Sequence, residues 1–171
     1  MERIDVRRLG PEATEFSWEV TAGALGLETE PAFRHPIKVE IRIRRIADRV
    51  IVSGTVGCRV RLECRRCLEE IEDEIKADVA VEYVEGPGSH RKEDVVRDEG
   101  ADVGTYTPPF VDLRDDLRQV LLLALTPYPL CGPDCRGLCP SCGTNLNTGS
   151  CSCGKGGVET RPVDGASDGR G

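Results

Sequence analysis

The sequence predicts an α+β fold, in which an antiparallel β-sheet forms a meander, one main helix packs on it, and a small cysteine-rich lobe follows. Three observations support this prediction. Apolar and polar residues alternate along three successive segments, as in half-buried strands. A later segment has apolar residues at helical spacing. Most of the cysteines lie beyond that segment.

The three predicted strands follow one another closely in the chain. The first alternates over residues 37–44, and the second, after a turn near Ala47-Asp48, over residues 56–64. The third covers residues 75–83, so that Cys64-Arg-Arg-Cys67 lies in the turn before it. Consecutive strands with short connections favour antiparallel pairing. The first 35 residues could add an edge strand, but their apolar pattern is too irregular to define its bounds.

The main helix is predicted to start at Asp112, whose carboxylate caps the first amides, with Asp115 favoured by the helix dipole in the first turn. Pro127 and Pro129 end it. A helix packed on the sheet explains its apolar stripe better than a partner-binding surface does. The stripe consists of Leu113, Leu117, Val120, Leu121 and Ala124.

Composition divides the chain into three parts. Residues 1–130 form the α+β domain, which includes a flexible acidic loop at about 85–107, rich in Gly, Asp, Glu and Arg. Residues 131–153 form the cysteine-rich lobe. Residues 154–171 have hardly any apolar side chain to offset the entropy of ordering, and are predicted to be a disordered tail.

Eight of the nine cysteines fall into four close pairs. Two thiolates a few residues apart can bind one tetrahedral ion, and two such pairs complete a structural zinc site, so four pairs predict two structural Zn²⁺ ions. Disulfides are the competing interpretation, but no apolar stretch at the start resembles a secretory signal. The predicted ligands are Cys64, Cys67, Cys131, Cys135, Cys139, Cys142, Cys151 and Cys153.

Spacing leaves two ways to combine the pairs. In one, the last two pairs form a compact site, and Cys64/Cys67 joins Cys131/Cys135 to link the lobe to the sheet. In the other, the second and third pairs share an ion and Cys64/Cys67 is a redox dithiol. The ninth cysteine, Cys58, has the apolar parity of its strand and is interpreted as a small buried hydrophobe.

The composition argues against several classes of protein. There are only two histidines and no phosphate-binding glycine loop, and a four-thiolate zinc site has no open position for substrate. We therefore expect no enzyme activity and no small-molecule substrate. Nothing approaches the roughly 20 apolar residues of a membrane span, and 31% of residues are charged. A cytoplasmic protein that makes no membrane contact is expected.

The net charge is −7, yet basic residues concentrate before Leu68 and acidic ones after it. Several arginines share the solvent-facing parity of the first two strands and could follow a phosphate backbone. An ordinary solvated face with Arg–Glu pairs fits equally well. Because aromatics make up only 4%, RNA contacts would involve backbone and shape rather than bases. The candidate RNA-binding residues are Lys38, Arg42, Arg44, Arg59, Arg61, Arg65 and Arg66.

From about Ile37 to Cys153 the chain resembles the YceD family of bacterial and plastid proteins. The resemblance rests on Cys64-Arg-Arg-Cys67-Leu68, on the helix that begins Asp112-Leu-Arg-Asp, and on Cys135-Arg-Gly-Leu-Cys-Pro-Ser-Cys-Gly-Thr-Asn-Leu-Asn147. It implies a ribosome-biogenesis factor that supports accumulation or processing of large-subunit ribosomal RNA by binding pre-ribosomal RNA or an early ribosomal protein. The alternative is a thiol-based redox or zinc-responsive switch, and a thiol-disulfide oxidoreductase ranks last.

Overall fold

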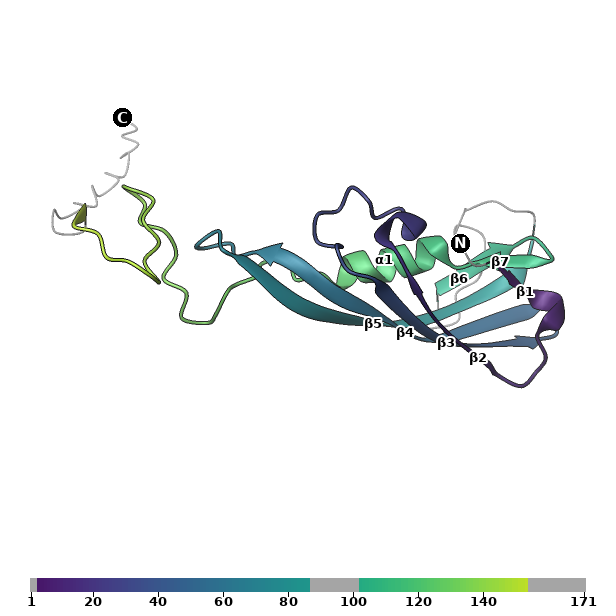
Figure 1. Cartoon of the computed structure of the whole chain (residues 1–171). Coiled ribbons are helices and arrows are strands. Elements are labelled where there is room, and N and C mark those ends of the chain that lie inside the picture. Colours follow the sequence, from purple (N-terminus) through teal and green to yellow (C-terminus); the bar gives the residue numbers. More distant parts are fainter. Residues whose placement is uncertain (1–2, 87–101, 154–171) are drawn as a thin grey trace, which may run out of the picture.

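The computed structural model describes residues 3–86 and 102–153. Within them, ten elements follow one another, and all seven strands come before the single α-helix (Figure 1). They are β1 (Arg3–Asp5), η1 (Val6–Arg8), β2 (Thr14–Val20), η2 (Ala22–Leu25), β3 (Ile37–Ile46), β4 (Arg49–Glu63), β5 (Glu70–Glu85), β6 (Asp102–Tyr106), β7 (Phe110–Asp112) and α1 (Arg114–Ala124).

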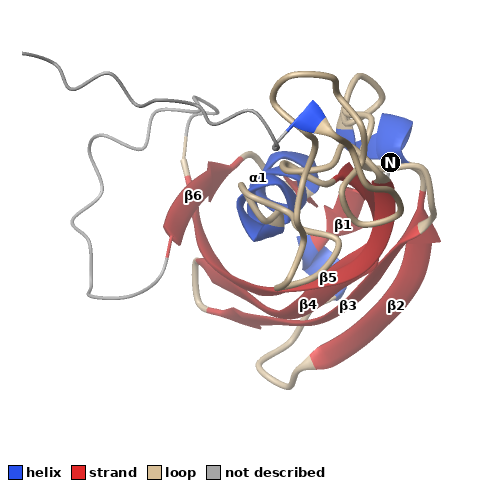
Figure 2. Ribbon diagram, turned by 90° about the vertical axis from the view of Figure 1, so that its left-hand side faces the viewer, coloured by secondary structure: helices blue, strands red, loops and turns tan. Residues whose placement is uncertain are grey.

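The main sheet has five strands in the order β2-β3-β4-β5-β6. The first four pair antiparallel, so the predicted meander is confirmed, and β6 adds to β5 in parallel. β1 and β7 form a separate two-stranded sheet. Figure 2 shows the main sheet curving around α1, which lies on its concave side. The α+β fold with one packing helix is therefore correct.

The core fills the space between the concave face and α1. Alternate residues of β3, from Ile37 to Ile43, are at most 2% exposed, as their period-2 pattern requires. Cys58 on β4 is also buried, and burial raises the pKa of its thiol to about 11. The interpretation of Cys58 as a small buried hydrophobe is confirmed. From the helix, Leu113, Leu117 and Leu121 complete this core.

The start of α1 differs from the prediction by one residue. Leu113 occupies the cap position, and the carboxylate of Asp112, one residue earlier, accepts a hydrogen bond from the Arg114 amide at 3.1 Å. Asp112 lies earlier because it also ends strand β7. In the first turn Asp116 accepts a hydrogen bond from the Tyr83 hydroxyl of β5, which joins helix and sheet.

Both edges of the main sheet lie where the sequence pattern is weak. β2 provides the edge strand that the first 35 residues could only suggest. β6 lies inside the segment expected to be an acidic loop, which is wrong for residues 102–106; residues 87–101 of that loop lie outside the described residues. Gly104 lies so close to the Tyr83 ring that a Cβ atom there would be 2.8 Å from it.

The predicted disordered tail, residues 154–171, lies outside the described residues.

The described part of the molecule is elongated. In Figure 1 the cysteine-rich lobe lies beyond the turn between β4 and β5, and the N-terminal strand β1 lies at the opposite end of the sheet. This arrangement places the lobe next to Cys64 and Cys67. Among the described residues, no helix is long and apolar enough to span a membrane.

Candidate metal centres and the outer face of the sheet

Two clusters of four cysteines lie at the lobe end of the molecule. The turn cluster consists of Cys64, Cys67, Cys131 and Cys135, and the lobe cluster consists of Cys139, Cys142, Cys151 and Cys153. Within each, all four sulfur atoms lie within 4.8 Å of one another. The structure thus brings together the first of the two combinations that spacing allowed. It does not place Cys131 and Cys135 with Cys139 and Cys142.

The sulfur separations fit a tetrahedral ion. Zinc binds thiolates at about 2.3 Å, so two sulfurs on one tetrahedron lie about 3.8 Å apart. In the turn cluster the Cys64 and Cys135 sulfurs are 3.7 Å apart, and those of Cys67 and Cys131 are 3.5 Å apart. Four thiolates at these separations match a closed structural zinc site, the donor set that zinc prefers when it has no catalytic role.

The turn between β4 and β5 delivers two of these sulfurs. The Leu68 amide donates to the Cys64 carbonyl at 2.9 Å, and the Cys64 amide donates to the Glu69 carbonyl at 2.8 Å. Leu68 takes a positive φ of 60°, which is uncommon for a branched residue and closes the turn. Cys64 and Cys67 are 0% and 4% exposed, so both sulfurs face the lobe rather than solvent.

The lobe is bound to this turn by backbone as well as sulfur. The Arg65 amide donates to the Pro129 carbonyl at 2.9 Å, and the Leu138 amide donates to the Arg66 carbonyl at 3.0 Å. Gly137 has a φ of +70°, and a Cβ atom there would lie 3.0 Å from the Arg66 carbonyl oxygen. Only glycine allows both the left-handed backbone and this close approach.

Two asparagines support the turn cluster, and sequence reasoning assigned neither a role. The Asn147 amide group donates to the Cys135 sulfur at 3.4 Å, while its carbonyl oxygen accepts from the Arg136 amide at 2.7 Å. Asn145 donates to the Glu69 carboxylate at 2.8 Å across the two parts of the site. Two asparagines spaced Asn-x-Asn just after a Cys-x-x-Cys-Gly segment could have indicated these roles, because thiolate sites need amide donors around them.

The lobe cluster has a turn of its own. The Gly143 amide donates to the Cys139 carbonyl at 2.9 Å, with Gly143 at a φ of 73°. The Cys139 amide donates to the Thr144 carbonyl at 2.8 Å, and the Thr144 hydroxyl lies 3.2 Å from the Cys142 sulfur. This compact turn holds two sulfurs from only a few residues, as Cys-x-x-Cys-Gly predicts.

The thiols within one cluster have very different pKa values. Burial raises the pKa of Cys64, but backbone amides of Cys67, Cys131 and Arg66 outweigh it and lower that pKa to about 6. Neighbouring sulfurs, Cys135 first, raise the pKa of Cys131 to about 12. Four thiolates so close together repel one another, and a divalent cation would relieve that repulsion. The donor set therefore fits a metal ion better than four free thiols.

The predicted basic face carries acidic side chains as well as basic ones. Arg42 pairs with Glu15 of β2 at 2.9 Å, Lys38 with Glu40 at 2.7 Å, and Arg61 with Glu70 at 3.3 Å. These carboxylates lie on the same outward face as the cations, and two of them come from the neighbouring strands β2 and β5. Three of the seven candidate RNA-binding side chains therefore have acidic partners.

The other four candidates fall into two places. Arg44 and Arg59 lie exposed on the outer face, and within residues 3–86 and 102–153 neither forms a salt bridge, although Glu74 of β5 lies directly across from Arg59 in the sheet. Arg65 and Arg66 lie exposed in the cysteine turn, where the Arg66 guanidinium donates to the Cys135 carbonyl at 3.0 Å. The structure therefore does not gather the seven into one patch.

Together, the curved sheet, the cysteine-bearing turn and the two four-thiolate clusters define an α+β protein with a candidate structural zinc lobe. The family model described as "Large ribosomal RNA subunit accumulation protein YceD" matches residues 52–163. That span includes most of β4, the cysteine turn, α1 and both clusters, and the chain belongs to this family.

Individual relatives are distant. An uncharacterized protein of Mycobacterium tuberculosis is 32% identical over 110 residues, 64% of this chain and 51% of the relative. The Arabidopsis thaliana protein named "Large ribosomal RNA subunit accumulation protein YCED homolog 1, chloroplastic" is 24% identical over 184 residues, 91% of this chain and 56% of the relative. A Zea mays protein of the same name is 28% identical over 144 residues, 70% of this chain and 49% of the relative. The chain spans about half the length of these relatives, and no solved structure matches it.

Proposed function

We propose that the protein is a ribosome-biogenesis factor that supports accumulation or processing of large-subunit ribosomal RNA, by binding pre-ribosomal RNA or an early ribosomal protein. The single observation that carries this proposal is the family match, which covers most of β4, the strands that follow it, the helix and both cysteine clusters. The names of the Arabidopsis and maize relatives support the same assignment.

In this proposal the two Zn²⁺ ions are structural. The turn cluster would hold the lobe against the end of the sheet, and the lobe cluster would shape the lobe itself. Four thiolates saturate each ion, so no position is left for substrate or water. The protein therefore acts by presenting a shaped surface to its partner and carries out no reaction.

Loss of the protein is expected to lower the amount of large-subunit ribosomal RNA relative to small-subunit ribosomal RNA. The test is gene deletion in the source organism, followed by quantification of both mature RNAs and of unprocessed large-subunit precursor. Return of the wild-type gene restores the ratio. An unchanged ratio, with growth and precursor also unchanged, contradicts the proposed function.

For direct contact with RNA, we propose Arg44 and Arg59 of the outer face as phosphate ligands, since neither forms a salt bridge in the described part of the chain. The double variant Arg44→Glu/Arg59→Glu is expected to weaken association with large-subunit precursor RNA and to reduce its salt dependence. The double variant Lys38→Glu/Arg42→Glu is the matched control, because Lys38 and Arg42 are already paired with Glu40 and Glu15. Equal effects of the two changes would remove the outer face as a specific contact.

A second candidate function is a thiol-based or zinc-responsive switch. One observation favours it: Cys131, Cys142 and Cys153 are exposed, so oxidants can reach at least one sulfur of each cluster. Such a switch would release metal on mild oxidation and loosen the lobe, whereas a structural site retains its metal.

A further inference from the structure

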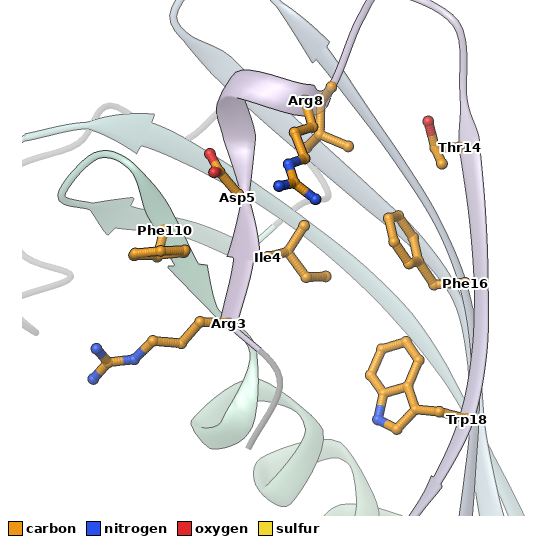
Figure 3. Close-up of a pocket in the computed structure, with 9 residues that line it drawn as sticks. Arg3, Ile4, Asp5, Arg8, Thr14, Phe16, Trp18 and Phe110 are labelled. Atoms are coloured by element: carbon orange, nitrogen blue, oxygen red, sulfur yellow. The ribbon is translucent and has the colours of Figure 1, made fainter.

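A cavity of about 480 Å³ lies at the end of the molecule opposite the lobe, between edge strand β2 and the β1–η1 segment. Its size is typical of sites that bind small ligands or single nucleotides. Figure 3 shows Ile4 of β1 and the rings of Phe16 and Trp18 of β2 pointing into the space between the two strands. Within the described ranges β2 pairs only with β3, so no strand closes this side.

Aromatic rings gather at this cavity in a chain that has few of them. Phe16, Trp18 and Phe110 line it, three of the seven aromatic residues in the sequence. Phe16 and Trp18 are two residues apart on the same face of β2 and are only half-buried. The indole N–H of Trp18 has no hydrogen-bond partner among residues 3–86 and 102–153. Ring faces with an unused donor beside them suit stacking and polar contact with a heteroaromatic ring.

The charge at the cavity favours an anion. The Arg7 guanidinium is held by the Asp5 carboxylate through two hydrogen bonds of 2.9 and 2.7 Å, and this pairing lowers the pKa of Asp5 to about 2. Arg7 thereby offsets Asp5, the one carboxylate among the described residues that line the cavity. Arg8 is exposed and extends its guanidinium into the space near Ile4 (Figure 3). It forms no salt bridge in the described part of the chain, although the Asp5 carboxylate lies near enough to feel its charge.

We propose that this cavity binds single-stranded RNA, with one nucleobase stacked against Phe16 and Trp18 and the adjacent phosphate bound by Arg8. Aromatic faces with an unpaired arginine beside them are how proteins hold unpaired nucleotides. This inference rests on the proposed function and names the form of RNA. The composition, with few aromatic residues, led us to expect RNA contacts to the backbone and not to bases. The proposal differs because the fold brings three of these few aromatic residues together at one cavity.

Trp18 is the only tryptophan in the chain, so its fluorescence reports directly on this site. Titration with an unstructured RNA of about eight nucleotides at low salt is expected to quench it to saturation. Arg8→Glu should weaken binding by about tenfold and lower the salt slope by about one. The matched control is Arg34→Glu, a charge reversal in the exposed loop before β3 that should leave affinity within about twofold of wild type.

Trp18→Ala, followed with labelled RNA instead of fluorescence, should also weaken binding by about tenfold, provided that circular dichroism shows the same fold. Absence of quenching, or quenching that Arg8→Glu leaves unchanged, overturns the proposal. So does quenching by an extended apolar peptide but not by RNA, which would assign the cavity to a protein partner. In these cases the ribosomal role still stands if deletion of the gene lowers large-subunit RNA, so the two failures are distinguishable.

Discussion

Cys64→Ser is expected to remove one zinc ion per chain and to release the lobe from the sheet. Cys64 is 0% exposed and supplies one of the four sulfurs of the turn cluster. Residues 131–153 contain no α-helix or extended strand, so only the metal and a few hydrogen bonds to the cysteine turn hold them in place. Structural zinc sites contribute about 10–16 kcal/mol of apparent binding free energy, which here is largely the folding free energy of the lobe.

Elemental analysis and limited proteolysis measure this effect. The variant should retain the ion of the lobe cluster and should be cleaved between α1 and Cys135, while the sheet stays intact by circular dichroism. Cys58→Ala is the matched control, because Cys58 is buried in the core outside both clusters and should not alter the zinc content. A Cys64→Ser protein with unchanged zinc content and a protected lobe would contradict the assignment of this cluster.

Leu121→Ala is expected to lower the free energy of unfolding of the sheet domain by about 2–5 kcal/mol. Leu121 is 0% exposed and packs in the core between α1 and the concave face. Alanine removes buried methyl and methylene groups and leaves a cavity, because the surrounding strands cannot fully collapse. Urea denaturation of the zinc-saturated protein, followed by far-ultraviolet circular dichroism, measures the change.

Leu123→Ala is the matched control for this prediction. The two leucines lie two residues apart on one helix, but Leu123 is 76% exposed. Its truncation should change the free energy of unfolding by no more than about 0.5 kcal/mol. Equal losses from the two substitutions would mean that the helix does not pack on the sheet as described.

Regular patterns made most of the fold predictable from sequence. The alternation from Ile37 onward predicts β3, β4 and β5, because only one face of each strand is buried. The helical spacing of Leu113, Leu117 and Leu121 predicts α1 and its packing face. The strands and the helix can both be identified from a single sequence, because each depends only on the spacing of apolar residues within its own segment.

Features that depend on contacts between distant residues were not predictable. β6 is short, contains Gly104, and is a strand only because it pairs with β5. The carboxylates that neutralise Arg42 and Arg61 come from strands outside the basic hairpin, so parity within the hairpin could not reveal them. The cavity at Trp18 likewise forms between segments that sequence analysis left undefined.

The candidate metal sites lie between these two cases. Spacing within each pair identifies the eight ligands, because a short turn can present two sulfurs to one ion. Which pairs share an ion depends on where β4 ends relative to the lobe, and spacing left two combinations open. The contact between Asn147 and Cys135 could be seen only once both segments were placed.

The most direct test of the central claim, that the two cysteine clusters are closed structural zinc sites, is native mass spectrometry of the protein purified under reducing conditions. Two zinc ions per chain are expected, one for each cluster, and both should be retained after mild peroxide treatment. Loss of metal on peroxide would instead favour the switch. A fully folded chain that carries no metal, with the lobe still protected from protease, would contradict the account.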